Sequence, residues 1–374
     1  MQSIVYVGMD VHKESLSLCA LNSTTGEILG ETKCALSTQM LCKFIASLKQ
    51  KCQQKYAEAV TVITGYEAGC LGYSWHNELE KLDIECHIMA PTTMYRSTKN
   101  KTFKNDHQDA KMIARNLANG TYRSVYVPDA EDNSIKEFIR LRKSFKSAQK
   151  KIKQQISAFT LRLGFSFPGK SKWTRVHLDW LDHLPLTGPL KMVLEEYLVQ
   201  YHELAQKIAR YDQELADFSH SDKYEQPVQK LRCFKGIDTV TGMVIHVEIS
   251  DFSRFPTSAA FAAYLGLTPY EHSSGNSINR GAITKQGNSV VRTTLVECAQ
   301  SLVRGKIGRK SKRVNARQQG QPVKVISYAD RAIERLQRKF YRMTASGKPY
   351  NVAIVAVARE LACFIWGMET ERID

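Results

Sequence analysis

Cysteine pairs and long apolar runs are what this sequence lacks. Its nine cysteines include no Cys-x-x-Cys pair and no Cys/His cluster at the spacing of a zinc site, which predicts reduced thiols buried as small apolar residues. No stretch approaches the roughly 18 apolar residues of a membrane-spanning helix. The N-terminus shows no basic segment followed by an apolar core, so no secretory signal is expected. These absences predict a cytoplasmic protein.

Acidic residues are also in short supply. The chain has 37 aspartates and glutamates against 53 lysines and arginines, a formal net charge of +16, with an ordinary apolar content of 43%. A folded protein with such a surplus of positive charge meets polyanions, most commonly nucleic acid. Charge alone leaves ribosomal and membrane-surface proteins as alternatives.

Two acids stand where predicted β-strands end. The run 2–10 is rich in β-branched and aromatic residues and ends in Asp10. The run 59–64 is of the buried type, and Glu67 follows it within a Gly-Tyr-Glu-Ala-Gly segment. An unpaired carboxylate buried among valine and isoleucine would be costly, so acids at such positions usually face a site.

The segment 104–115, KNDHQDAKMIAR, carries two more acids. In a helix, Asp106 and Asp109 lie side by side one turn apart, with Asn105 as a cap. Two carboxylates held that close repel each other unless a cation lies between them, and a divalent metal is the usual one. First-turn acids that complement the helix dipole are the alternative.

Residues 1–130 are therefore predicted to form an α/β domain with an RNase H-like (RuvC-like) fold. Its expected elements occupy about 125 residues, a typical size for one domain. Because all four acids fall in this domain, we interpret them as one site rather than as separate surface residues. Two metal ions held there would activate water or a hydroxyl and stabilise the leaving oxygen of a phosphodiester, which predicts nucleic-acid strand cleavage.

Residues 131–220 show the pattern of two long helices. In the first, lysine and arginine fill most outer positions around an apolar seam that includes Leu141, Phe145 and Ile152. In the second, which includes Leu190, apolar residues recur in alternating threes and fours over about four heptads. With a Pro/Gly loop between them, the helices predict an antiparallel coiled-coil hairpin that pairs with a second subunit. Two ordinary core helices are the alternative.

Residues 221–374 are predicted to form a second, mainly α-helical domain. Two helices joined by a tight turn at 236–238 resemble a helix-hairpin-helix, in which backbone amides approach a phosphate, although a plain helical hairpin fits equally well. The basic run from Arg304 to Lys324 is interpreted as a loop that faces nucleic acid rather than as core. The two helices expected after it show no site chemistry.

The second chemically informative stretch lies inside residues 255–300. It holds a loop rich in serine, glycine and asparagine, whose candidate nucleophiles are Ser273, Ser274 and Ser277. The cations near it are candidate nucleic-acid contacts: Arg280, Lys285 and Arg292. A hydroxyl in a glycine-flanked loop bordered by cations suits attack on a phosphate, because the cations offset its charge. An ordinary polar loop is the alternative.

These segments together resemble a known family. The order of the strand-end Asp10, the GYEAG segment, the NDHQDAKMIAR segment and the blocks YLGLTPYEHSSGN and RGAITKQGN is similar to that of the DEDD transposases of bacterial insertion sequences. The Piv-type DNA invertases belong to the same family. The resemblance spans nearly the whole chain and implies an N-terminal RuvC-like domain, a coiled-coil dimerisation element and a C-terminal transposase domain.

The resemblance also implies the site residues. Matched by position, the metal-binding tetrad that would hold Mg²⁺, or Mn²⁺, falls on Asp10, Glu67, Asp106 and Asp109. The serine nucleophile falls on Ser274, with the adjoining Ser273 as the alternative. Where the family usually has Lys-Thr-Asp before the first acid of the pair, this chain has asparagine in the middle position.

The partners and the reaction follow from the same resemblance. Family members cut and rejoin DNA through a covalent phosphoserine, work as homo-oligomers that reach a tetramer on DNA, and in insertion sequences use a structured non-coding guide RNA. This resemblance implies a nucleoid-associated bacterial recombinase. A Piv-like invertase, a hydrolytic Holliday-junction nuclease and an inert basic scaffold are the alternatives, the last disfavoured because uncompensated carboxylates would weaken binding to a polyanion.

Overall fold

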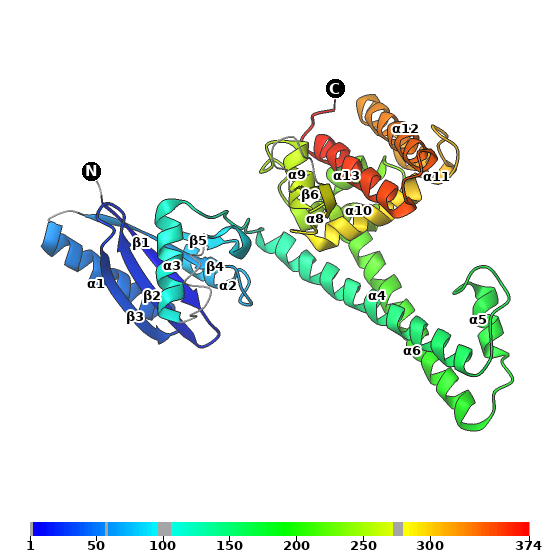
Figure 1. Cartoon of the computed structure of the whole chain (residues 1–374), viewed down its shortest axis with the longest axis horizontal. Helices are drawn as coiled ribbons and strands as arrows, with labels where there is room; N and C mark the ends of the chain where they lie inside the picture. Colours follow the sequence, from blue (N-terminus) through cyan, green and yellow to red (C-terminus); the bar gives the residue numbers. More distant parts are fainter. Residues whose placement is uncertain (1–2, 57–58, 96–105, 272–279, 374) are drawn as a thin grey trace. The chain divides into compact units, whose positions relative to one another are not determined.

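The computed structural model describes residues 3–56, 59–95, 106–271 and 280–373, and these residues form two compact units (Figure 1). The first unit spans Met1–Val127 and the second spans Pro128–Asp374. The first is α/β and the second is mostly helical, which confirms the predicted division of fold class. The finer division of the second unit at residue 220 stays a prediction.

The first unit is built on a five-stranded sheet. Its strands are β1 (Ser3–Val11), β2 (Ser15–Asn22), β3 (Ile28–Ala35), β4 (Val60–Glu67) and β5 (Cys86–Met89), in the order β3-β2-β1-β4-β5. The pairs β1–β2 and β2–β3 are antiparallel, whereas β1–β4 and β4–β5 are parallel. This mixed sheet is consistent with an RNase H-like domain. Glu67, expected just beyond a strand, is the last residue of β4.

Helices cover both faces of this sheet. On one face, α1 (Thr38–Tyr56) packs its buried leucines against the alternate β1 residues Val5, Val7 and Met9. On the other face lies α3 (Asp106–Asn119), which packs against β1, β2 and β4. Because successive strand residues point to opposite faces, the remaining β1 residues, Asp10 among them, lie on the α3 face. The short helices α2 (Ser74–Glu80) and η1 (Pro91–Thr93) flank β5 in the chain.

The second unit begins with two long helices. These are α4 (Ala130–Arg162) and α6 (Gly188–Phe218), which pack along each other with the short α5 (Arg175–Asp182) joining their apolar seam. Within the predicted seam, Ile152 is buried, but Leu141 and Leu190 are 42% and 43% exposed. The two helices are therefore confirmed as a packed pair, while the dimeric coiled coil stays a prediction.

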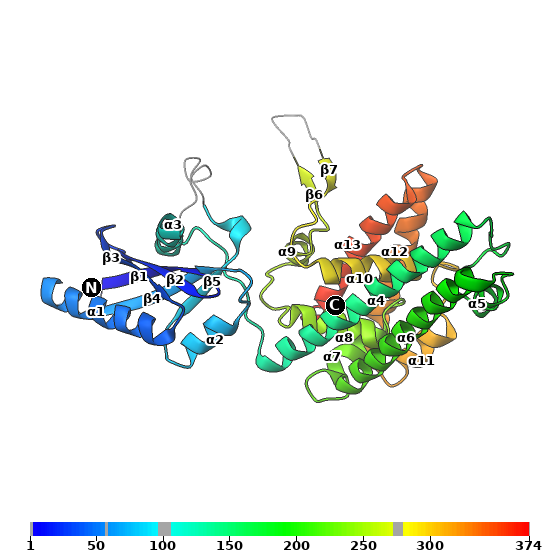
Figure 2. The ribbon, with the colours of Figure 1, turned by 90° about the horizontal axis from the view of Figure 1, so that it is seen from below.

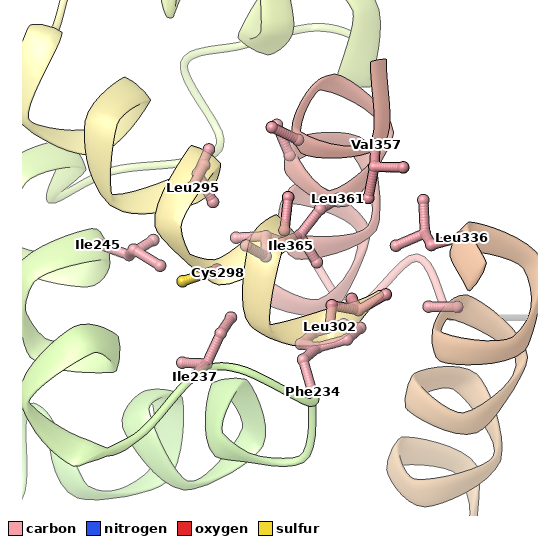
Figure 3. Packing of buried hydrophobic residues seen from close by; sticks show 14 of the residues in the cluster. Phe234, Ile237, Ile245, Leu295, Cys298, Leu302, Leu336, Val357, Leu361 and Ile365 are labelled. Atoms are coloured by element: carbon pink, nitrogen blue, oxygen red, sulfur yellow. The ribbon is translucent and has the colours of Figure 1, made fainter. Parts of the chain in front are cut away.

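The rest of the second unit encloses its main hydrophobic core. The elements are α7 (Glu225–Arg232), α8 (Thr239–Ile249), α9 (Ser258–Tyr264), β6 (Pro269–Glu271), β7 (Arg280–Ile283), α10 (Ser289–Leu302), α11 (Lys312–Gln318), α12 (Val323–Ala345) and α13 (Tyr350–Glu369). Figure 3 shows side chains from α8, α10, α12 and α13 converging on this core. By length and composition α13 could cross a membrane, but 56% of its apolar window is buried in the unit. Its apolar surface thus serves the core.

The basic run 304–324 is only partly a loop, so its interpretation as a loop rather than core was wrong in part, whereas its contact with nucleic acid stays a prediction. It contains α11, where Val314 and Gln318 are 2% and 3% exposed. Lys310 donates to Gln318 at 2.9 Å and to Asp330 at 2.7 Å, and Arg317 donates to the backbone oxygen of Ile237 at 2.7 Å. Several cations of this run therefore hold the fold together.

Candidate functional site

Two of the predicted acids lie at neighbouring positions on one face of the sheet. Gly8 and Gly65 are direct partners in the parallel register of β1 and β4. Asp10 and Glu67 stand two residues further along their strands, and residues two apart in a strand share a face. A Cβ atom on Gly8 would overlap the backbone of α3, and one on Gly65 would lie 3.2 Å from Leu117 of the same helix. Both carboxylates therefore start from the face that α3 covers.

The first turn of α3 lies toward these acids. Ala110 and Ala114 lie over Gly8, whereas Ile113 and Leu117 share a hydrophobic cluster with residues earlier in the strands. The helix therefore runs opposite to β1, with its N-terminus toward the carboxyl ends of the strands. Asp109 directly precedes Ala110 and is partly exposed. Asp106 is the first residue of α3, and its side chain lies outside the described part of the structure.

A histidine that was not predicted from the sequence lies beside Asp10. His12 lies two residues beyond Asp10, just after β1 ends, and its Nε2 donates a hydrogen bond to Asp10 Oδ2 at 3.1 Å. The Asp10 side chain is 17% exposed and that of His12 is 55% exposed. The Asp-x-His spacing at a strand end is the signal that would have identified it, because residues two apart in an extended chain share a face.

The donors near α3 suit a hard divalent cation. Carboxylate oxygens are the ligands that Mg²⁺ and Mn²⁺ prefer, and Asp10, Glu67 and the start of α3 meet at the same end of the sheet. Among the side chains that the structure describes, no three His, Cys, Asp or Glu residues lie close enough to hold a metal ion. The carboxylate donors of Asp10, Glu67 and the start of α3, and their position at one end of the sheet, fit such a metal.

The second candidate site is the β-hairpin of the second unit. β6 and β7 pair in antiparallel fashion and project from α9, as Figure 2 shows. The candidate nucleophiles Ser273, Ser274 and Ser277 belong to the segment between these strands and lie outside the described residues. Arg280 begins β7, but its side chain is not described. The structure does describe the stem of this hairpin, by which we mean β6, β7 and the residues that join them to α9 and α10.

The stem is tightly packed where it joins the helices. Gly266 and Gly287 both have positive φ, and a Cβ atom on either would overlap the backbone of the facing segment. Gly281 lies directly against the ring of Tyr270, so the two strands also touch through a side chain. The Lys285 amide donates to the Gly266 carbonyl at 3.1 Å. These contacts fix where the serine segment leaves the body of the unit.

Arg292 ties this stem to α10. Its Nη1 donates to the backbone oxygens of Leu265 at 2.9 Å and of Gln286 at 2.8 Å. Asn288 caps α10 by accepting from two backbone amides, and its side-chain nitrogen donates to Glu248 of α8 at 2.8 Å. Arg292, expected as a nucleic-acid contact, thus has a structural partner on each side of the hairpin. Lys285 is exposed.

Replacing Arg292 with methionine tests this clamp. We expect the free energy of unfolding to fall by about 1 to 2 kcal/mol, because the partly buried Leu265 carbonyl and the exposed Gln286 carbonyl lose their charged donor. Urea unfolding of the full chain measures the change. Lys285→Met is the matched control, since it removes one charge from the same hairpin but no side-chain hydrogen bond that the structure describes. Equal stability of the two variants would show that Arg292 serves only an external ligand.

A basic groove runs beside α10. It has a volume of about 700 Å³ and lies between α4, the first turn of α8 and α10. The α4 side contributes five cations: Arg142, Lys143, Lys146, Lys150 and Lys153. Arg142 pairs with Asp212 of α6. Burial, together with the nearby Lys146, lowers the pKa of Lys153. The lining also includes three acids, Asp212, Asp238 and Glu297, so the groove keeps a surplus of two positive charges (five cations against three acids).

The turn predicted at 236–238 forms part of this groove. Gly236 has a φ of 96°, and a Cβ atom there would lie 2.6 Å from the Cys298 carbonyl, so only glycine lets the turn approach α10. Asp238 caps α8 by accepting from the Thr241 amide at 2.8 Å. The structure confirms two helices, α7 and α8, joined by a tight turn. Phosphate binding by the backbone amides at the start of α8 stays a prediction.

Comparisons with known proteins cover both candidate sites. A DEDD-type transposase model of IS110 matches residues 7–165, and a model described as the transposase IS116/IS110/IS902 family matches residues 228–315. A Sinorhizobium fredii protein named "Putative transposase y4qE" is 30% identical over 98% of this chain and 88% of its own length. The transposase for insertion sequence element IS1533 of Leptospira borgpetersenii is 28% identical over 93% of this chain and 99% of its own. The transposase for insertion sequence element IS1111A of Coxiella burnetii is 23% identical over 81% of this chain and 79% of its own length.

The first family model therefore covers the four acids, and the second covers the segment that holds the serine hairpin. Similarity of this extent, to transposases along nearly the whole chain, shows the family. The chain belongs to the IS110 family of insertion-sequence transposases, a class of enzymes that cut and rejoin DNA.

Proposed function

We propose that this transposase moves its DNA element through a covalent phosphoserine intermediate, with Ser274 as the nucleophile. The acids Asp10, Glu67, Asp106 and Asp109 would bind Mg²⁺ or Mn²⁺. The observation that supports this most is the Gly8–Gly65 pairing, which sets two of the four acids at neighbouring strand positions under the first turn of a helix that begins with the other two. Such convergence has no role in a purely structural sheet.

The proposed serine reaction needs no external energy source, because each bond that breaks is replaced by a bond of the same kind. The Ser274 oxygen attacks the phosphorus of a DNA phosphodiester, a serine–phosphate bond forms, and the bond from phosphorus to one deoxyribose oxygen breaks. The serine proton is lost and the released strand end gains one as a hydroxyl. Attack of another strand's hydroxyl on the phosphoserine reverses these changes and joins that strand. The bond energy is conserved throughout.

The protein's residues would share this work by position. Mg²⁺ held by the acids would neutralise charge on the phosphate. His12, hydrogen-bonded to Asp10, would hold that carboxylate in a fixed orientation. The basic groove beside α10 would hold the DNA backbone on the unit that carries the serine hairpin. The clamp at Arg292 would keep the stem of that hairpin in place.

A structured non-coding RNA as guide and a homo-oligomer on DNA complete the proposal. Their support is the family resemblance, together with the formal net charge of +16, which favours binding to nucleic acid. Selection of target by base pairing would leave the protein to contact backbones rather than to read bases. A preparation freed of RNA that still recombined DNA efficiently would remove this part of the proposal.

Removing the metal or one acid tests the catalytic part. We expect chelation by EDTA, and Asp10→Asn, each to lower strand cleavage at the element junction by at least about 1,000-fold, since charge stabilisation at the phosphate is lost. The assay follows cleavage of labelled junction DNA by protein that retains its co-purifying RNA. Glu78→Gln, on the exposed face of α2, is the matched loss of one carboxylate. Cleavage that persists in EDTA would contradict the metal-bound tetrad.

A further inference from the structure

Helix α12 has one exposed face that is rich in arginine. Its apolar side chains, such as Leu336 and Phe340, are buried in the core, and Leu336 points toward α13 (Figure 3). The opposite face carries a row of four exposed arginines at spacings of four, three and four residues: Arg331, Arg335, Arg338 and Arg342. These spacings keep side chains on one side of an α-helix. The sequence analysis assigned no chemistry to this helix.

The arginine row borders two adjoining hollows. One, of about 650 Å³, lies between α12 and α13, and the other, of about 600 Å³, follows α12. They share Arg331, Arg335, Lys339 and Glu360, so they form one continuous groove. Its charged lining comprises two carboxylates, Glu334 and Glu360, and seven cations, namely Arg331, Arg335, Arg338, Lys339, Arg342, Arg359 and Arg372.

The two carboxylates do not neutralise this surface. Glu360 pairs with Arg335 and accepts from Lys339 at 2.7 Å, and Glu334 accepts from Arg338 at 3.0 Å. Burial by itself raises the pKa of Glu360, but the hydrogen bonds from Lys339 and Arg335 outweigh it and lower that pKa. Even so, the side chains of Arg335 and Arg338 are 70% and 69% exposed. Both arginine side chains therefore remain largely accessible to a ligand.

We infer that the arginine row of α12 is a docking surface for the phosphodiester backbone of double-stranded DNA. From Arg331 to Arg342 the helix rises about 16 Å, which matches several successive phosphates of one strand. Arginine suits phosphate because its planar fork donates two parallel hydrogen bonds. A membrane surface fits less well, because the apolar face of α12 is already buried in the core.

This surface is distinct from the proposed catalytic machinery. It lies on elements that follow the serine hairpin in the chain, and it includes none of the acids, the serine segment or the groove beside α10. Its role would be to hold DNA that flanks the reacting strand. The inference needs only that the protein binds DNA, and it stands whether or not Ser274 is the nucleophile.

The salt dependence of DNA binding tests the inference. In the triple variant Arg335→Gln, Arg338→Gln, Arg342→Gln, the slope of log affinity against log salt concentration should fall by about 2 to 3, since each lost phosphate contact contributes about 0.9. The corresponding triple lysine variant keeps the charge and should keep most of the slope. Fluorescence anisotropy with junction duplex, on the full chain, measures both.

Three further proteins make the result decisive. Lys43→Gln, Lys49→Gln, Lys51→Gln removes the same charge from exposed positions of α1 and should leave the slope unchanged. Ser274→Ala should also keep the slope, although it forms no adduct if the proposed function holds. The serine mechanism and the docking surface on α12 are therefore tested independently. The wild type and the triple arginine-to-glutamine variant, both measured with duplex RNA, and circular dichroism of every variant complete the set. An unchanged slope in a folded arginine variant, an equal fall in the α1 variant, or a fall seen with RNA alone would overturn the inference.

Discussion

Replacing Ser274 with alanine should abolish the covalent protein–DNA adduct and lower strand cleavage by at least about 1,000-fold, since a missing nucleophile cannot be replaced by its neighbours. The measurement incubates the protein with Mg²⁺ and its own junction DNA, then follows the adduct through denaturing electrophoresis. A phosphoserine link survives denaturant, whereas a DNA complex held by hydrogen bonds and charge does not.

The neighbouring serines provide the matched controls. Ser273→Ala and Ser277→Ala remove the same hydroxyl from the same segment and should keep the adduct. If Ser273→Ala abolished it instead, the nucleophile would be one residue earlier. Cleavage without any adduct in the wild type, indifferent to all three changes, would mean hydrolysis by water at the acid tetrad. That outcome would contradict the serine mechanism and leave the tetrad in place.

Gly8→Ala adds one methyl group and should strongly destabilise the first unit. A Cβ atom at this position would overlap the carbonyl oxygen of Ala110 and the amide nitrogen of Ala114, both of them backbone atoms of α3. No side-chain rotation relieves this overlap, so α3 must move away from β1. We expect a loss of about 3 kcal/mol in the free energy of unfolding. Because Asp109 belongs to the displaced helix, metal-dependent cleavage should be lost as well.

Gly30→Ala is the control within the same sheet. A Cβ atom on Gly30 would lie 3.5 Å from the Phe44 ring, an ordinary contact, so stability should change by less than about 0.5 kcal/mol. Urea unfolding compares the two variants, and hydrogen exchange of the α3 amides reports whether that helix is released. Full protection of α3 in Gly8→Ala would show that the helix tolerates a methyl group beneath it.

Local patterns were sufficient for the strands, the helices and the order of the acids. The β-branched and aromatic run 2–10 predicted β1, which spans Ser3–Val11. The apolar periodicity predicted the long helices α4 and α6. These features depend on neighbours in the chain, which is why they could be read without the fold.

Local patterns failed where distant residues decide the outcome. The basic run from Arg304 was expected to face nucleic acid, yet Lys310 and Arg317 find partners far away in the sequence. The nucleic-acid contact expected of Arg292 stays a prediction, but no local pattern indicated that two backbone carbonyls from separate segments accept its hydrogen bonds. A cation has the same appearance in a sequence whether it is destined for solvent or for a carbonyl. Only the packed chain distinguishes the two.

The sequence by itself determined the α/β and helical halves, the positive surplus and the residue types of the candidate site. The tertiary structure decided three other matters: that Gly8 and Gly65 meet in register beneath α3, that the serine hairpin is clamped by Arg292, and that the arginines of α12 share an open groove. The physical reason is that secondary structure follows from periodicity over a few residues. Register, clamping and grooves arise when segments far apart in the chain exclude water from between them.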